Sequence, residues 1–157
     1  MKALGVLLFL AAALLFTAHA LKSEKRRCEE AEGVYLLFLH MKRGICKEAL
    51  PLPEIYLSFE NEALEGTSFL SAVRKNGLLY GLKKVPPPLP SAVLRSLVLY
   101  AEGIGKRFLD EERDAIEKAC ALLASGVEEM RSALPARLKM QGTLLLSGSG
   151  MMLLLFI

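Results

Sequence analysis

The distribution of charge along the chain constrains its fold more than any other feature. Residues 3–21 and residues 140–157 contain no Lys, Arg, Asp or Glu, and every charged residue except Lys2 lies between them. A helix rises about 1.5 Å per residue, so one over 140–157 would be about 27 Å long, close to the ~30 Å of a hydrocarbon core. We therefore predict transmembrane helices over 1–21 and 140–157, with a helical bundle over 22–139.

The segment that follows Asp110 is predicted to be one long helix that runs into the second apolar stretch. Asp110 and the two glutamates after it suit the first turn of a helix, where free amides and the helix dipole favour acceptors and negative charge. Apolar residues then recur at steps of four and three, which places them on one face of the helix. They are Ile116, Cys120, Leu123, Val127, Met130 and Leu134. We expect this face to enter the core, with Cys120 as part of it.

The rest of the bundle is expected to consist of shorter helices separated by Gly and Pro, which makes the fold class all-α. By periodicity alone the apolar run from Val34 to Met41 could be a buried strand or a buried helix, and its Leu and Met content and charged, helix-compatible flanks favour a helix. The charged segment before it is compatible with continuing the first apolar run as one helix. The prolines at 51 and 53 predict a turn into a helix from Glu54 to about Glu62.

Capping residues predict where two further helices begin and end. Thr67 is the expected N-cap of a helix that closes at Asn76-Gly77. Residues 78–85 show no decisive pattern. The prolines at 86–88 and 90 predict an extended connector. Ser91 is the expected cap of the next helix, which ends at Gly103–Gly105.

The N-terminal run admits two interpretations. Ala18-His19-Ala20 resembles a signal-peptide cleavage site, which would give an exported helical protein cleaved after Ala20 and held by its C-terminal tail. The alternative is an uncleaved anchor, and the charge distribution favours it. Positive charge beside a span prefers the cytoplasm, only Lys2 precedes the first run, and basic residues also lie before the second. Four basic residues follow the first run at once: Lys22, Lys25, Arg26 and Arg27. We therefore expect a multi-pass protein of the cell membrane with a cytoplasmic bundle.

Two sets of residues are candidates for binding. Lys22, Lys25, Arg26 and Arg27 can hold anionic lipid headgroups at the membrane surface. Gly142, Gly148 and Gly150 lie in the second apolar run, where small residues let helices approach closely. We predict that these glycines pack against the first span or against another subunit.

No pattern in the sequence predicts catalysis, a cofactor or a metal. The chain has no Walker loop, GxGxxG, HExxH or GxSxG motif. The cysteines at 28, 46 and 120 have no CxxC spacing, which argues against zinc and against a disulfide framework. His40 has no Ser, Cys or acidic partner at motif spacing, and a structural role is expected for it. The charges of 22–139 are nearly balanced, so nucleic acid is not an expected partner.

Several parts of the chain occur in a characteristic order. They are the apolar run at each end, the basic first helix, Pro51-Leu52-Pro53-Glu54, the turn Ala101-Glu102-Gly103-Ile104-Gly105 and the acidic start at Asp110. In this order the chain resembles the stage III sporulation protein AB family over nearly its whole length. The resemblance implies a bundle similar in fold to the cytoplasmic domain of the F-type platform protein of type II secretion.

The resemblance also implies a role. Members of that family belong to the complex that joins mother cell and forespore during sporulation. The implied function is that of a non-enzymatic platform subunit, with its main domain on the mother-cell side of the membrane. The implied partners are the bilayer, a cytoplasmic ATPase of the same complex and other membrane subunits of the channel.

Overall fold

The computed structural model describes the backbone of residues 2–156 and the side chains of 18–137, 139, 140 and 143, together with 11, 12 and 15. Every element within this described part is helical, which confirms the prediction of an all-α fold. The chain divides into two compact units. One is residues 27–129, which we call the head. The other is residues 1–26 with residues 130–157.

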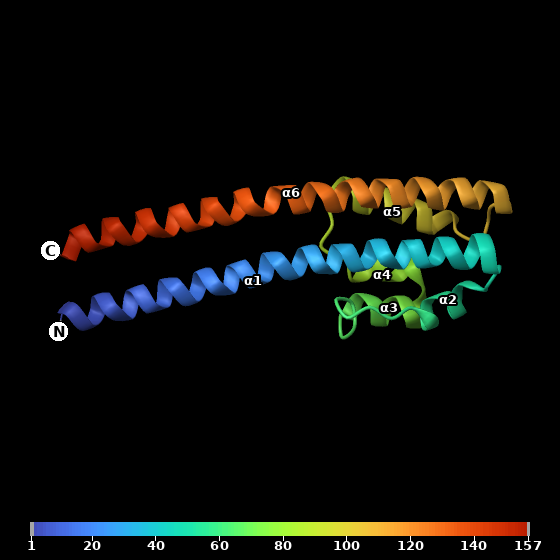
Figure 1. Cartoon of the computed structure of the whole chain (residues 1–157). Coiled ribbons are helices and arrows are strands. Elements are labelled where there is room, and N and C mark those ends of the chain that lie inside the picture. The colour runs from blue at the N-terminus through green and yellow to red at the C-terminus, as the bar shows by residue number, and fades with distance from the viewer. Residues whose placement is uncertain (1, 157) are drawn as a thin grey trace. The chain divides into compact units, whose positions relative to one another are not determined.

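Two long helices contribute to both units (Figure 1). Helix α1 covers Lys2–Arg43, so the N-terminal apolar run, the basic segment and the predicted helix over 34–41 belong to one element. Helix α6 covers Leu109–Phe156 and continues through Pro135. A π-helical turn over Gly44–Glu48 and shorter helices connect the two. Their bounds are Leu52–Ser58 for α2, Ser68–Asn76 for α3, Leu78–Lys84 for α4 and Ser91–Gly103 for α5.

The head is built around the C-terminal turns of α1. In Figure 1 these turns lie between α5 and α6 on one side and α3 and α4 on the other. Val34, Leu37, Phe38 and Met41 are fully buried in the core that joins these helices. Their spacing of three and four puts them on one face of α1, as expected for a helix that packs through a single stripe. The prediction of a buried helix over 34–41 is therefore confirmed.

Helix α6 supplies the opposite side of the core through the predicted apolar face. Ile116, Cys120, Leu123 and Val127 are all buried, which confirms this part of the face and the core position of Cys120. Met130 and Leu134, the last two residues of the predicted face, are half-buried and belong to the other unit. Gly126 allows α5 to approach closely, because a Cβ there would lie 2.9 Å from a methyl group of Val93. Bulk at this position would push the two helices apart.

The structure corrects the predicted bounds of α2. It begins at Leu52 and ends at Ser58, whereas the sequence predicted a helix from Glu54 to about Glu62. Phe59 has extended backbone angles, which stop the helix. Just beyond it, the Asn61 side chain accepts hydrogen bonds from the amides of Ala63 and Leu64 at 3.1 and 3.2 Å. A side chain that binds nearby amides in this way favours a turn over a further helical turn.

Two other helix starts also differ from the prediction. Ser91 is the first residue of α5 rather than its cap, and the capping position is Pro90, with no side-chain hydrogen bond. The reason is that the Pro90 carbonyl already accepts the first helical hydrogen bond, from Leu94 at 2.9 Å. Helix α6 begins at Leu109, so Asp110 lies within its first turn rather than before it.

Helices α3 and α4 form a tight pair. Thr67 is the N-cap of α3, as predicted, and Gly77 ends it with φ of +86°. A positive φ is readily adopted only by glycine, so the chain can turn at once into α4. The residues without a decisive pattern, 78–85, thus form a helix whose Gly81 lies against Val73 of α3.

Removing the α3 cap should weaken the head measurably. The Thr67 hydroxyl accepts from the Leu70 amide at 3.3 Å and donates to the Leu64 carbonyl at 2.7 Å. We expect Thr67→Ala to lower the free energy of unfolding by about 1 kcal/mol. The measurement is urea unfolding of the full chain in detergent, followed by far-ultraviolet circular dichroism. Ser71→Ala, at an exposed position of α3, is the control, and an equal loss there would contradict the capping role.

Within the described residues, no helix is both long and apolar enough to cross a membrane. The predicted spans over 1–21 and 140–157 consist mostly of residues whose side chains lie outside the description. In the unit formed by the chain ends, Arg137 of α6 and Glu24 of α1 form an ion pair at 3.7 Å. This contact joins the two long helices within that unit.

Candidate functional site

The predicted lipid-binding residues are exposed on α1. Lys22, Lys25 and Arg26 share one helix face through their spacing of three and four, whereas Arg27 projects from a neighbouring face. All four side chains are accessible to solvent, as headgroup binding requires. The helix-packing candidates Gly142, Gly148 and Gly150 belong to α6 but lie outside the residues whose side chains are described.

His40 has a structural role in the head. Its Nε2 atom lies 3.0 Å from the Ser58 hydroxyl, and its ring lies 5.5 Å from that of Phe59. The Ser58 hydroxyl also donates to the Ile55 carbonyl at 3.2 Å. The contact between His40 and Ser58 ties α1 to the end of α2.

The structure brings together a polar cluster that the sequence analysis missed, formed by Tyr100, Arg107 and Glu112, and the Glu112 charge also acts on the buried Tyr56. Glu112 is 5% exposed and Tyr100 is 6% exposed. Arg107 Nη1 lies 3.5 Å from Glu112 Oε2 and donates to the Tyr100 carbonyl at 3.4 Å. Its guanidinium also lies over the Tyr100 ring, 5.5 Å from the centroid. The cluster thus links α5, the loop after it and the first turn of α6.

Local sequence positions Arg107 in this cluster. Gly105 turns the loop with φ of +74°, and Gly103 leaves room for the guanidinium, which a Cβ at that position would overlap. One signal for Glu112 was present in the sequence. It lies four residues before Ile116, so it extends the buried face of α6 by one turn. Its charge made it look like a solvent-exposed member of an acidic first turn.

The cluster holds polar groups without complete hydrogen bonding. Within the described residues, neither carboxylate oxygen of Glu112 nor the Tyr100 hydroxyl has a protein partner at hydrogen-bonding geometry. A buried carboxylate is destabilising unless it is paired, and here the pairing comes from the Arg107 charge. The arrangement therefore depends on Arg107 staying in place, which makes the α5–α6 loop a fixed part of the head.

The cluster also shifts the ionisation of two buried tyrosines. Burial raises the pKa of Tyr56 to about 12; a hydrogen bond from the Leu78 amide opposes this shift and the Glu112 carboxylate adds to it. Burial, followed by the Glu112 carboxylate, raises the pKa of Tyr100 far above its usual range. Both phenols are therefore neutral at physiological pH, and neither is poised as a base or a nucleophile. Within the described residues, no group of His, Cys, Asp or Glu side chains could hold a metal ion.

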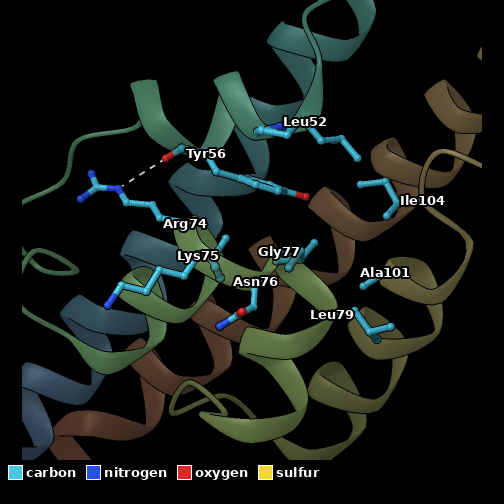
Figure 2. A pocket seen from close by; sticks show the side chains of 12 residues that line it. Leu52, Tyr56, Arg74, Lys75, Asn76, Gly77, Leu79, Ala101 and Ile104 are labelled. Atoms are coloured by element: carbon cyan, nitrogen blue, oxygen red, sulfur yellow. Dashed lines mark hydrogen bonds between the residues drawn. The ribbon is translucent and has the colours of Figure 1, made fainter.

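An open pocket of about 490 Å³ lies beside Tyr56, where α2, α4 and α5 meet the end of α3. Figure 2 shows Tyr56 reaching across it from α2, with its hydroxyl pointing away from Arg74. The apolar lining includes Leu52, Leu79 and Ile104, and Lys75 adds a positive charge. The pocket has the apolar surface and charged edge of a protein-docking site more than the convergent polar groups of a catalytic one.

Arg74 is held on the pocket's edge by several contacts. It donates to the Phe59 carbonyl at 2.6 Å and to the Tyr56 carbonyl at 3.4 Å, and it forms an ion pair with Glu65 at 2.9 Å. These contacts fix α3 against the end of α2. Of the two basic residues at the pocket's edge, Arg74 is paired with Glu65, whereas Lys75 has no ion pair within the described part of the chain. The Lys75 charge is therefore available to a partner.

Because Tyr56 is buried, we expect the free energy of unfolding of the head to fall at alkaline pH. Below pH 10 the phenol of Tyr56 is protonated in both the folded and the unfolded chain, and its full contribution to the stability of the fold is present. Between pH 10 and about 12 only the unfolded chain loses the proton, so stability falls as the pH rises. Tyr56→Phe cannot ionise and should lose less stability over this interval than the wild type. Urea midpoints measured below pH 10 and near pH 12 test this, and a difference between the two proteins that is the same at both pH values would contradict it.

No family model, curated protein or solved structure matches this chain.

Proposed function

We propose that this chain is a non-enzymatic membrane platform subunit of a sporulation channel between mother cell and forespore, and that its head docks a cytoplasmic ATPase. The observation that carries the proposal is the distribution of apolar residues along α1 and α6. Each of these helices supplies core residues to the head and also contains one uncharged terminal run. A head whose two principal helices end in such runs suits a subunit that anchors and couples other components.

The order of parts along the chain supports the specific channel. The basic first helix, the Pro51–Glu54 turn and the Ala101–Gly105 turn follow the order of the stage III sporulation protein AB family. Lys22, Lys25, Arg26 and Arg27 favour a cytoplasmic head and can bind anionic headgroups. By this proposal both apolar runs span the membrane and the glycines at 142, 148 and 150 pack against a neighbouring span.

Exposed apolar side chains on the head support a docking role. Leu57 of α2 is 65% exposed and Tyr80 of α4 is 45% exposed. Both line a broad hollow of about 820 Å³ along α3. Exposed apolar residues that gather around a hollow are typical of surfaces that bind another protein. We propose this hollow as the ATPase-docking surface.

The location of the head is the first test. Full-length protein is produced in a bacterium, and spheroplasts are treated with a membrane-impermeant maleimide before and after permeabilisation. Cys28 and Cys46 are half-buried and should react in the folded chain. Cys120 is buried and its burial raises the thiol pKa, so its labelling requires a denatured control. Labelling only after permeabilisation supports a cytoplasmic head, whereas labelling of intact spheroplasts would favour the exported, tail-anchored alternative.

ATPase docking needs a separate test. A candidate ATPase of the proposed sporulation complex, taken from the same organism, is co-expressed with the chain and recovered through a tag on the chain. We expect Leu57→Asp and Tyr80→Asp each to reduce recovery at least about fivefold, because each removes an apolar contact at the hollow. Leu99→Asp, at a 64% exposed position of α5, is the matched control. Unchanged recovery with the first two variants would exclude this hollow as the docking surface.

A further inference from the structure

The loop before α6 presents apolar side chains to solvent. Phe108 is 82% exposed, more than any other large apolar side chain in the described part of the chain, and Leu109 is 54% exposed. The Asp110 side chain, which follows directly, is 97% exposed. We call Phe108, Leu109 and Asp110 the tip. An exposed phenylalanine next to an exposed leucine is unfavourable in water unless another surface covers both.

The pocket beside Tyr56 has the complementary character and lies next to the tip. Ile104, which lines the pocket, belongs to the same loop as Phe108. Leu52, on another wall, lies 4.0 Å from the position that a Cβ of Gly105 would occupy. The pocket is apolar inside with Lys75 at its edge. The tip is apolar and carries the exposed Asp110 carboxylate, one oxygen of which lies 3.8 Å from Arg113 of the same helix.

We propose that the tip of one copy fills the pocket of a second copy, so that two heads form a dimer about a twofold axis. Phe108 and Leu109 would enter the apolar pocket, and Asp110 would pair with Lys75 of the other copy. Because tip and pocket are neighbours on one molecule, a twofold axis lets both copies make the exchange at once, and the assembly closes at two. The pocket of about 490 Å³ has room for the two apolar side chains.

This inference does not depend on the proposed function, and its first test uses the full chain in detergent. Analytical ultracentrifugation over a concentration series should show a monomer–dimer equilibrium. Phe108→Asp should raise the dimer dissociation constant at least about tenfold, because a charge replaces the apolar group that enters the pocket. Leu36→Asp makes the same type of change at a 45% exposed position of α1 that belongs to neither the tip nor the pocket, and it should leave the constant unchanged. Circular dichroism would verify that both variants keep the helical fold.

A charge exchange tests the pairing itself. Lys75→Asp and Asp110→Lys should each weaken the dimer about threefold, the scale of an exposed ion pair. The chain that carries both changes restores the pairing with its signs reversed, so its dissociation constant should return to within about twofold of the wild type. Lys84→Asp removes the same charge outside the pocket and should have no effect.

Cross-linking identifies the surface that the tip contacts. With the photoreactive amino acid p-benzoylphenylalanine at position 108, illumination should join two copies of this chain, and mass spectrometry should map the second site to the pocket walls around Leu79 or Ile104. A chain that stays monomeric, a dimer that Phe108→Asp leaves intact, or a cross-link only to lipid or to another protein would each overturn the proposal. A dimer held by the terminal helices, for example, would remain intact in the Phe108→Asp variant.

Discussion

Replacing Leu37 with alanine should lower the free energy of unfolding of the head by about 2–5 kcal/mol, the range for truncating a buried leucine. Leu37 is 0% exposed and lies on the α1 face that packs into the core, so the truncation removes apolar contacts and leaves a cavity. A single substitution of this size can consume much of the stability of a small domain.

Leu36 provides a matched control, because it is the adjacent residue, of the same type and in the same helix, but it is 45% exposed. Both substitutions change helix propensity equally, so the difference between them measures burial alone. We expect Leu36→Ala to change stability by at most about 0.5 kcal/mol. Urea unfolding of the full chain in detergent, followed by far-ultraviolet circular dichroism, compares the two. Similar losses would mean that this part of α1 is not the centre of the head.

Removing the Arg107 charge should destabilise the head by about 3 kcal/mol, because it leaves the Glu112 carboxylate buried without a partner. Arg107→Met keeps most of the side-chain volume while it removes the guanidinium. The substitution also removes the contact with the Tyr100 ring and the hydrogen bond to the Tyr100 carbonyl. Lys106→Met, at the adjacent exposed residue of the same loop, is the control and should leave stability nearly unchanged.

The double variant separates charge pairing from packing. Glu112→Met alone should cost less than Arg107→Met, because the Arg107 side chain is 27% exposed and water can solvate its unpaired charge, whereas the Glu112 carboxylate is buried. In the double variant Arg107→Met/Glu112→Met no buried charge remains, and most of the stability lost with Arg107→Met should return. A double-mutant cycle on urea unfolding gives the coupling energy. Additive effects would show that Glu112 does not depend on Arg107.

Helices and caps that depend on local periodicity and on adjacent residues could be predicted from the sequence. The buried face of α6 from Ile116 to Val127 follows from the 3.6-residue repeat, which requires no knowledge of the partner helices. The helix over 34–41 was predicted from its composition and its charged flanks, and which of its faces is buried came from the structure. The Thr67 cap and the turn at Gly77 likewise depend on a few adjacent residues. The predicted end of α2 was wrong. The Asn61 side chain competes with the helix for backbone amides, and composition does not reveal that competition.

The residues that form the candidate site could be identified only from the tertiary structure. Asp110 and Glu112 are two acids in one helical turn, yet the first is exposed and the second is buried, and only the spacing of Glu112 from Ile116 hints at this difference. The difference arises because the rotation of α6 about its axis is set by its packing in the core. Tyr100, Arg107 and Glu112 come from α5, a loop and α6, and no spacing in the chain predicts that they meet. Contacts between distant segments depend on how the helices pack together, and local sequence patterns carry little information about that packing.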